Sequence, residues 1–432
     1  MPIKTFHITN SYHATSGGIS TFYRALFKAA NRLGRSMSLI VPGDKTRTEE
    51  VGEFGRIHHV KSPRSPLFDR RYRLLMPQNY LPFLDGEMLR ILKDEKPDLI
   101  EVCDKYSVCW LAGLLRRNWL SGLPRPVLVG MNCERMDDNV GAFMTRGNVG
   151  KRWSQFYLGN LYVPLFDYHI ANSEYTAAEL HSAMTQKHPR EVRVLPMGAQ
   201  IAEFEAAHPN EAKRRQLISQ LGGNERTKLL LYAGRLSPEK NVPLLVETME
   251  RLASESSEDF RLVVAGSGPL ADWFESEACR RASGKVLLLG QVQDRQALIN
   301  LYANCDAFVH PNPREPFGIA PLEAMAAGLP LVAPNAGGVL SYADETNSWL
   351  AKPVAEAFAV AVKNIFADVS ARKDKLARAR WTAAQYCWPS VADRFFSLYD
   401  ELHADFPQSR FAYQLQTNRP IPTASSSERA LP

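Results

Sequence analysis

The arrangement of apolar residues along the chain restricts its fold more than any other feature. Short, nearly continuous apolar runs, such as "DLIEV" at 98–102 and "PVLVGM" at 126–131, alternate with longer stretches in which apolar residues recur every three or four positions. The continuous runs are typical of strands buried on both faces of a parallel sheet, and the stretches between them are typical of amphipathic helices. This alternation predicts an α/β fold built from βαβ units.

The alternation stops near the middle of the chain and then begins again. After a polar stretch around 198–210, further strand-like runs follow, namely "TKLLLYAG", "FRLVVAG", "KVLLLG", "DAFVHP" and "LPLVAP". We therefore expect two facing Rossmann-like domains with doubly wound parallel sheets and a cleft between them. The expected first domain covers 1–200 and is completed by a C-terminal helix at about 388–406. The second covers 207–387, and 408–432 form a tail without periodicity.

Composition argues against several other classes of protein. A net charge of +6 over 432 residues is too small for a dedicated nucleic-acid-binding protein. The six cysteines stand singly, without the Cys-x-x-Cys pairs of a zinc site or the pattern of a disulfide framework, so we expect no bound metal. The first residues lack the pattern of a signal peptide, which predicts a cytoplasmic protein.

Ligands of open α/β sheets bind at the carboxyl ends of the strands, so the loops that follow strands are the candidate sites. Gly17 and Gly18 follow the first strand, where their backbone could approach an anion or simply make a tight turn. Arg235 and Lys240, in "GRLSPEKN", suit a diphosphate, with solvated loop cations as the competing explanation. Gly266, in "VVAGSGP", would admit a base or a ribose, although close backbone packing explains it as well.

Two carboxylates stand in the otherwise small and apolar segment "REPFGIAPLEAMAAGLPLVAP". Glu315 and Glu323 have seven residues between them, and the segment predicts a helix that begins near Gly318 and ends at Gly328, with Glu323 in its first turn. The N–H groups at the start of this helix suit a phosphate, and the two carboxylates suit hydroxyl groups on either side of it. The competing explanation is that Glu323 complements the helix dipole and Glu315 is solvated.

Together these motifs resemble those of the family 4 glycosyltransferases of the GT-B fold. The matching segments span most of the chain and include "SGGIST", "NSEYTAAEL", "VLPMG", "GRLSPEKN", "EPFGIAPLEAMAAGLPLVAPNAGGV" and "WPSVADRFFSLY". The resemblance implies transfer of a sugar from a nucleoside diphosphate sugar to a hydroxyl acceptor, with retention of the anomeric configuration and without a metal ion or other cofactor.

The resemblance also implies roles for individual residues. Glu315 would contact the donor sugar and Glu323 the ribose hydroxyls, while Arg235 and Lys240 would neutralise the diphosphate. We take Glu315, Arg235 and Lys240 as the catalytic residues. The remaining donor-binding positions are Gly17, Gly18, Gly266, Phe317, Gly318, Ile319 and Ala320.

One position departs from the pattern of the family. The family usually carries a histidine near the donor sugar, after the strand corresponding to "PVLVGM", but here the chain reads "GMNCERMDDN". Asn132 or Cys133 takes that place, depending on the register, and Glu134, Asp137 or Asp138 are other groups that would orient the sugar. The missing histidine keeps open a non-catalytic nucleotide-sugar-binding protein, and a nucleotide-sugar epimerase of the same fold is the other alternative.

The acceptor is marked only by basic and aromatic residues of the first domain. Arg64, Arg70, Arg71 and Arg73 precede an apolar stretch, and "TRGNVGKRWSQFYLGNLY" repeats the combination. Such a surface suits anionic lipid, which predicts a lipid-linked acceptor and a peripheral contact with the inner face of the membrane. A solvated helix face and a small sugar acceptor are the competing explanations. The base and sugar of the donor and the oligomeric state remain undefined by the sequence.

Overall fold

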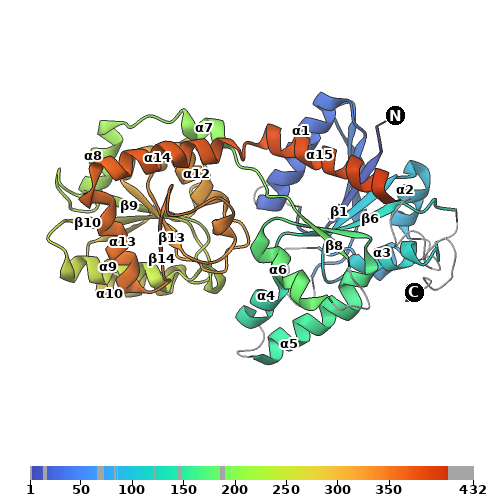
Figure 1. Cartoon of the computed structure of the whole chain (residues 1–432), viewed down its shortest axis with the longest axis horizontal. Helices are drawn as coiled ribbons and strands as arrows, with labels where there is room; N and C mark the ends of the chain where they lie inside the picture. Colours follow the sequence, from blue (N-terminus) through green and yellow to red (C-terminus); the bar gives the residue numbers. More distant parts are fainter. Residues whose placement is uncertain are drawn as a thin grey trace, which may run out of the picture.

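The structure is a computed structural model that describes residues 2–12, 17–65, 73–81, 84, 86–120, 122–143, 148–184 and 190–406, with the backbone alone at 141–143 and 148. Arg70, Arg71 and the tail expected at 408–432 lie outside the described residues. Two sheets form, one in each of two α/β domains that lie side by side (Figure 1). In this part of the chain, no helix combines the length and the apolar character needed to cross a membrane.

The first domain holds an eight-stranded sheet in the order β3-β4-β2-β1-β5-β6-β7-β8. Its strands are β1 (Thr5–Thr9), β2 (Met37–Gly43), β3 (Arg47–Val51), β4 (Gly55–Lys61), β5 (Leu99–Cys103), β6 (Val127–Asn132), β7 (Tyr168–Ala171) and β8 (Glu191–Val194). Neighbouring strands are parallel except for β3, which pairs antiparallel with β4 at one edge. The sequence predicted a wholly parallel sheet and did not predict β3. The residues of β3 are exposed and mostly polar, which is common in edge strands.

Helices cover both faces of this sheet. On one face pack α1 (Gly18–Leu33) and the C-terminal helix α15 (Trp388–Asp405), and on the other α2 (Glu87–Glu95), α3 (Cys109–Arg116) and α6 (Glu174–Ala183). Short turns η1 (Pro77–Asn79), η3 (Leu158–Tyr162) and η4 (Val163–Leu165) complete the second layer. Helices α4 (Met136–Phe143) and α5 (Asn148–Tyr157) project from the lower side of the domain in Figure 1.

The second domain holds a six-stranded, wholly parallel sheet in the order β11-β10-β9-β12-β13-β14. Its strands are β9 (Lys228–Ala233), β10 (Phe260–Ala265), β11 (Val286–Leu288), β12 (Ala307–Val309), β13 (Leu331–Pro334) and β14 (Trp349–Ala351). This is the doubly wound Rossmann order, in which the sheet reverses its direction of growth between β9 and β12. A ligand is therefore expected where the loops after these two strands leave the sheet.

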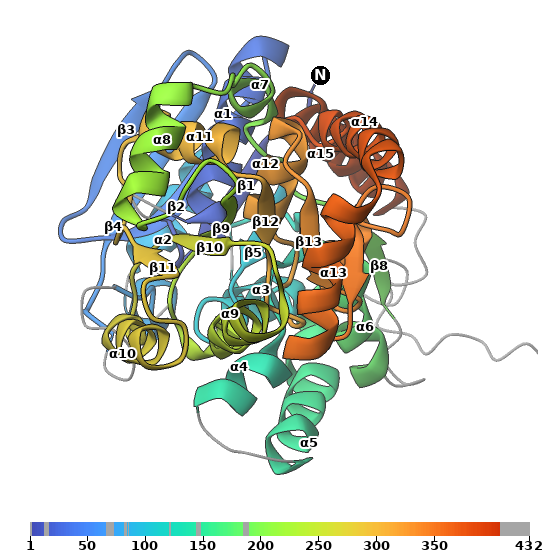
Figure 2. The same cartoon turned by 90° about the vertical axis from the view of Figure 1, so that its left-hand side faces the viewer.

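Two helical layers enclose this second sheet, as Figure 2 shows. One layer contains α7 (Ile201–Glu205), α8 (Glu211–Gln220), α11 (Arg295–Asn304), α12 (Ile319–Ala327) and α14 (Val369–Ala384). The opposite layer contains α9 (Pro243–Glu255), α10 (Ala271–Arg281) and α13 (Ala355–Ala367). The sequence prediction of two α/β domains is thus confirmed.

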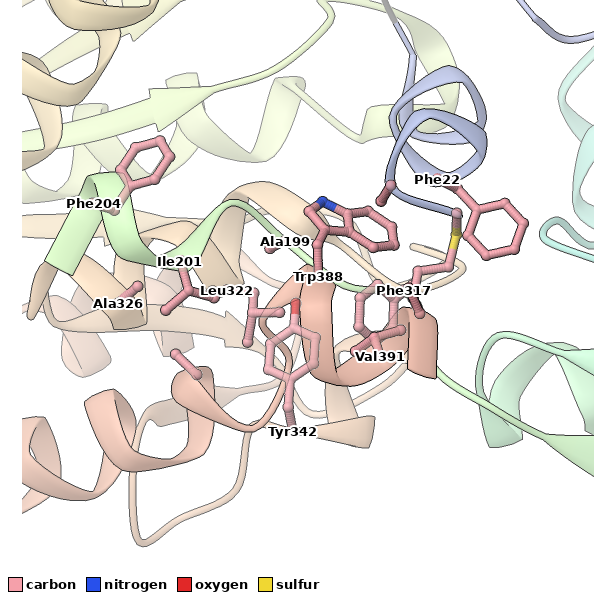
Figure 3. Close-up of a cluster of buried hydrophobic side chains, with 14 of the residues drawn as sticks. Phe22, Ala199, Ile201, Phe204, Phe317, Leu322, Ala326, Tyr342, Trp388 and Val391 are labelled. Carbon is pink, nitrogen blue, oxygen red and sulfur yellow. The ribbon is translucent and has the colours of Figure 1, made fainter. Parts of the chain in front are cut away.

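The chain passes between the domains twice, and the two passages are packed together. Ala199 pairs with Cys387, and Gly198 leaves room for the ring of Trp388, which a Cβ at that glycine would approach to 2.6 Å. Figure 3 shows Trp388 among buried side chains from both domains, including Phe22 and Phe317. One hydrophobic cluster therefore continues through both domains.

Candidate active site

The loops after β9 and β12 meet at the point where the order of the second sheet reverses. Lys240 ends the short turn η5 (Pro238–Lys240) in the first loop, and Glu315 lies in the second loop, ahead of α12. The Nζ of Lys240 donates to both carboxylate oxygens of Glu315, at 3.0 and 2.8 Å. Two of the three predicted catalytic residues, 75 positions apart in the sequence, therefore form an ion pair at this edge of the sheet.

Glu315 is a buried and fully ionised acceptor at neutral pH. Its residue surface is 9% exposed, and the Nδ2 of Asn312 adds a hydrogen bond at 3.0 Å. Burial raises the pKa of Glu315, but the charge of Lys240, the nearby His310 and the two sets of hydrogen bonds outweigh it, so the pKa falls to about 2. His310 lies 3.9 Å away with its own pKa lowered by burial to about 4, which leaves its ring neutral at pH 7.

Helix α12 carries the second carboxylate. Gly318 precedes it with a φ of 88°, a left-handed conformation that favours glycine, and Gly328 ends it in the same region, as the sequence predicted. Because the helix begins at Ile319, Glu323 is its fifth residue and lies just beyond the first turn, whereas the sequence pattern predicted it within that turn. The interpretation that Glu323 only complements the helix dipole is weakened by this position.

The environment of Glu323 is the electrostatic opposite of that of Glu315. Glu323 is 7% exposed, and its Oε1 accepts one long hydrogen bond from the Nη1 of Arg295, at 3.4 Å. The Nε of Arg295 also donates to Glu203 of α7, at 2.8 Å. Burial raises the pKa of Glu323 to about 7, and the partly exposed Arg295 offsets only part of that effect. Hydroxyl donors of a ligand would therefore favour its ionised form.

Residues 315–318, the donor loop, present backbone groups rather than a side chain between these carboxylates. The ring of Phe317 is buried against Tyr342 and Tyr386, with centroid distances of 5.3 and 5.9 Å, so only its backbone can face a ligand. Within the described residues, the N–H groups of Phe317 and Gly318 donate no hydrogen bond. The N–H groups of Ile319 and Ala320 lie at the start of α12 and have no acceptor inside the helix. These four N–H groups together suit a phosphate.

The predicted glycines lie around this donor loop. Gly17 precedes α1 with a φ of 107°, and a Cβ at Gly18 would lie 3.3 Å from the Cδ1 of Ile319, so the first domain meets the start of α12 here. A Cβ at Gly266 would lie 1.8 Å from the carbonyl oxygen of Gly234, which shows that the loop after β10 packs directly on the loop after β9. Close packing accounts for Gly266, and its contact with a donor remains a prediction.

Arg235 lies in the same loop as Lys240 but has a different environment. Its side chain is exposed, and among the described residues it forms no ion pair or side-chain hydrogen bond. The backbone carbonyl of Arg235 accepts a hydrogen bond from the hydroxyl of Tyr232 at 3.0 Å, which holds the loop while leaving the guanidinium unpaired. A cation in this state is available for an anionic ligand.

The two residues predicted at the position of the missing histidine point in different directions. Asn132 is fully buried, and its Nδ2 donates to the carbonyl oxygens of Gly130 and Ile170, while its Oδ1 has no hydrogen-bond partner among the described residues. Cys133 is partly exposed, and its contact with Cys103 together with burial raises the pKa of its thiol well above the ordinary value. Both residues stay predictions for that position, and Cys133, as a neutral thiol, is the more exposed of the two.

The alternative carboxylates near that position are mostly engaged. Asp137 accepts two hydrogen bonds from Arg135, at 2.9 and 2.6 Å, and Asp138 accepts one from the hydroxyl of Tyr175. Glu134 is exposed.

Sequence reasoning missed four residues that shape the site. Asn312 and Arg295 bind the two carboxylates directly, and Ser173 and Tyr342 bind the carbonyl groups of Pro316 and Gly318. Ser173 is the second residue of the segment "NSEYTAAEL", where a capping residue is expected, but nothing in the local pattern indicates its contact with the other domain. Tyr342 carries no sequence signal.

Comparison with solved structures identifies the arrangement of the two domains. Sucrose-phosphate synthase from Thermosynechococcus elongatus matches with a TM-score of 0.71 at 21% identity, over 93% of this chain and 99% of that one. Anabaena Alr3699/HepE, solved with UDP and glucose, matches with a TM-score of 0.66 at 16% identity, over 92% and 100%. The two parallel-sheet domains therefore define the chain as a GT-B glycosyltransferase fold, as the sequence predicted.

Sequence comparisons agree with the structural match. The model of Glycosyltransferase Family 4 matches residues 16–203, and that of Glycosyl transferases group 1 matches 213–381. The GDP-mannose-dependent alpha-(1-6)-phosphatidylinositol dimannoside mannosyltransferase of Mycobacterium tuberculosis is 25% identical over 90% of this chain and 94% of its own. The alpha-monoglucosyldiacylglycerol synthase of Streptococcus pneumoniae is 26% identical over 75% and 69%.

The chain belongs to the family 4, group 1 glycosyltransferases, which confirms the resemblance seen in the sequence. It is an enzyme that transfers a sugar from a nucleotide sugar.

Proposed function

We propose that the enzyme is a retaining, metal-independent glycosyltransferase that moves a hexose from a nucleoside diphosphate sugar to a hydroxyl group of a lipid-linked acceptor. The observation that carries this proposal is the placement, at one switch point, of an ionised Glu315 paired with Lys240, a row of free N–H groups and a buried Glu323. Residues 207–387 would bind the donor, and residues 1–200, completed by α15, would bind the acceptor.

Each group has a defined task in this proposal. The ribose hydroxyls donate to Glu323, a sugar hydroxyl donates to Glu315, and the N–H groups at the start of α12 bind the distal phosphate. Lys240 and the unpaired Arg235 neutralise the charge that develops on the departing diphosphate, which is the work a metal ion would otherwise do. In the described part of the chain, no cluster of three or more His, Cys, Asp or Glu side chains is arranged to hold a metal.

The state of Glu315 bears on the route by which the configuration would be retained. Its low pKa and its three hydrogen bonds, two from Lys240 and one from Asn312, make it a poor nucleophile. A covalent glycosyl intermediate on this carboxylate is therefore disfavoured, and attack by the acceptor on the face that the diphosphate leaves fits the site better.

Arg235 offers the most direct test of the donor site. We expect Arg235→Ala to lower kcat/KM by about 10²-fold, because one charge-assisted contact to the leaving diphosphate is lost. Hydrolysis and transfer should be measured across UDP-, GDP- and ADP-sugars, with Arg215→Ala, an exposed arginine of α8, as the control. A full rate in Arg235→Ala would refute the assigned role, and donor binding without turnover on any acceptor would favour the non-catalytic alternative.

A lipid-linked acceptor is supported by the surface of α5 in the first domain. Val149, Trp153 and Phe156 are 74%, 49% and 61% exposed and follow one another at helical spacing, with the exposed Lys151 and Arg152 beside them. An exposed apolar stripe flanked by cations suits the interface of an anionic membrane. By their names, one of the two relatives above is a mannosyltransferase for phosphatidylinositol dimannoside, and the other synthesises a monoglucosyldiacylglycerol.

The membrane contact can be measured by sedimentation with vesicles. We expect the double variant Trp153→Ala/Phe156→Ala to bind vesicles that contain anionic lipid about tenfold more weakly than the parent, since two interfacial aromatic side chains are lost. Trp381→Ala is the matched control, because Trp381 is 70% exposed on α14 of the other domain. Equal binding of the parent and the double variant would argue for a small, water-soluble acceptor.

A further inference from the structure

Three carbonyl groups of the donor loop are held by hydrogen bonds from different directions. The N–H of Gly338 donates to the carbonyl of Glu315 at 2.6 Å, and the hydroxyl of Tyr342 donates to that of Gly318. Both donors belong to the second domain. The carbonyl of Pro316, between them, accepts instead from the Oγ of Ser173, at 2.6 Å, and Ser173 belongs to the first domain.

The direction of each carbonyl determines the direction of the following N–H group. A trans peptide unit is planar, so its C=O and N–H point to opposite sides. The Pro316 carbonyl and the Phe317 N–H share one such unit, and the structure contains no cis peptide bond among its described residues. By holding the Pro316 carbonyl, Ser173 therefore turns the Phe317 N–H away from itself, and that N–H is one of those left free for a phosphate.

Ser173 is itself held firmly in place. It is fully buried and serves as the N-cap of α6, where its Oγ accepts from the N–H of Thr176 at 3.1 Å and its own N–H donates to the Thr176 hydroxyl at 3.2 Å. The hydroxyl proton remains for the Pro316 carbonyl. One side chain therefore fixes the end of a helix in the first domain and the backbone of the donor loop in the second.

We propose that Ser173 is a positioning residue for sugar transfer, which sets the Phe317 N–H toward the donor phosphate only when the two domains lie together. This inference rests on the proposed donor-binding role of the loop. Tyr342 performs the corresponding task for the Ile319 N–H from within the second domain, so its hydrogen bond does not depend on the placement of the domains. The site is thus completed by the domain that would carry the acceptor.

Because Ser173 and Tyr342 lie in different domains, replacing their hydroxyl groups should have different effects. Donor binding in the absence of acceptor depends on the second domain, so Ser173→Ala should leave the donor Kd unchanged while lowering kcat about tenfold, the effect of one hydrogen bond. Tyr342→Phe should weaken donor binding and lower kcat together, because its bond is present whenever the loop is folded. Ser173→Thr keeps the hydroxyl and should retain the rate of the parent.

The loss of the helix cap must be distinguished from the loss of the contact between domains. Ser173→Gly also removes the hydroxyl that donates to Pro316, but glycine is tolerated at a helix N-cap and adds no charge to this buried position. It should therefore keep a melting temperature close to that of the parent and lose activity as Ser173→Ala does. The experiment measures Kd for the donor nucleotide sugar without acceptor, kcat at saturating substrates and Tm, for the parent and these four variants.

The outcomes separate the inference from the proposed function. A reduced kcat in the Ala and Gly variants, with unchanged Kd and with rescue by Thr, supports the inference. A parent that binds and transfers normally, with Ala and Gly variants that match it, refutes the inference alone. An equal rise of Kd in both variants also refutes it, since Ser173 would then act on donor binding itself. A parent that binds no nucleotide sugar overturns the inference and the proposed function together.

Discussion

Replacing Lys240 with methionine should reduce kcat/KM by about 10³-fold and also destabilise the second domain, because the lysine has two roles. It neutralises the leaving diphosphate in the proposed mechanism, and it is the main counter-charge of the buried Glu315. Breaking a fully buried pair by removing one partner costs about 3–5 kcal/mol, and the 28% exposure of the Lys240 side chain places this case near the lower end of that range. Steady-state kinetics and thermal unfolding measure the two losses.

The double variant Lys240→Met/Glu315→Gln separates the two roles. Removing the unpaired carboxylate should restore most of the lost stability but none of the activity. Lys285→Met is the matched control: Lys285 pairs with Asp259 at a similar exposure but precedes β11, at the amino end of the strands and away from the cleft. It should lose stability without losing activity. A Lys240→Met enzyme as stable as the parent would show that the ion pair does not stabilise Glu315.

The strands of this fold are readable in the sequence because most are buried on both faces. Runs such as residues 228–233 and 260–265 are apolar almost throughout, and the structure forms β9 and β10 over the same residues. The same argument explains why the sequence did not predict β3. Its residues, RTEEV, contain no apolar run because the strand lies exposed at the edge of the sheet. The local pattern of apolar residues therefore predicts strands that are buried in the core. An edge strand forms by pairing with its neighbour, which the local pattern does not show.

The site was predictable as a set of loops but not as a set of contacts. The rule that ligands bind after the strands located Glu315, Lys240 and Arg235 in advance. The pairing of Glu315 with Lys240 depends on β9 and β12 being neighbours, which strand order determines and local sequence does not show. The choice between Asn132 and Cys133 stayed open for a similar reason: at the end of a strand buried on both faces, the residue pattern does not tell which side chain turns toward the cleft.

The two carboxylates have opposite electrostatic environments, which suggests a division of labour. Glu315 is held ionised by a lysine, whereas Glu323 is desolvated and faces only the partly exposed Arg295 and the more distant Glu203. Environments that push two neighbouring groups apart in pKa commonly mark different tasks. In the proposed function, Glu315 would keep a fixed charge for the sugar, and Glu323 would become a strong acceptor when ribose hydroxyls reach it.

Glu323 should therefore make the protein less stable as the pH rises from about 4.5 to about 7. Its pKa is about 7 in the folded protein against 4.5 for a solvated side chain, so the folded state holds the proton more tightly. Stability present below pH 4.5 is lost between pH 4.5 and 7, at about 1.4 kcal/mol for each pH unit in that interval. Glu323→Gln removes this loss, so we expect it to unfold at a higher temperature than the parent at pH 8 and at nearly the same temperature at pH 4.

The same substitution should destroy donor affinity, which distinguishes a functional carboxylate from an accidental one. In the parent, donor affinity should rise with pH up to about 7 as Glu323 ionises, whereas Glu323→Gln should bind about 10²-fold more weakly with no such rise, because two charge-assisted hydrogen bonds to the ribose are weakened. An intact nucleotide sugar is the required ligand, since a free nucleoside diphosphate carries a terminal phosphate that itself titrates near pH 6.

Glu203→Gln, which removes the exposed partner of Arg295, is the control and should leave affinity intact. If Glu323→Gln stabilised the enzyme and still bound the donor tightly, the buried carboxylate would serve neither folding nor binding. A binding residue held in an unfavourable environment must instead show both effects when it is replaced, a gain in stability and a loss of donor affinity.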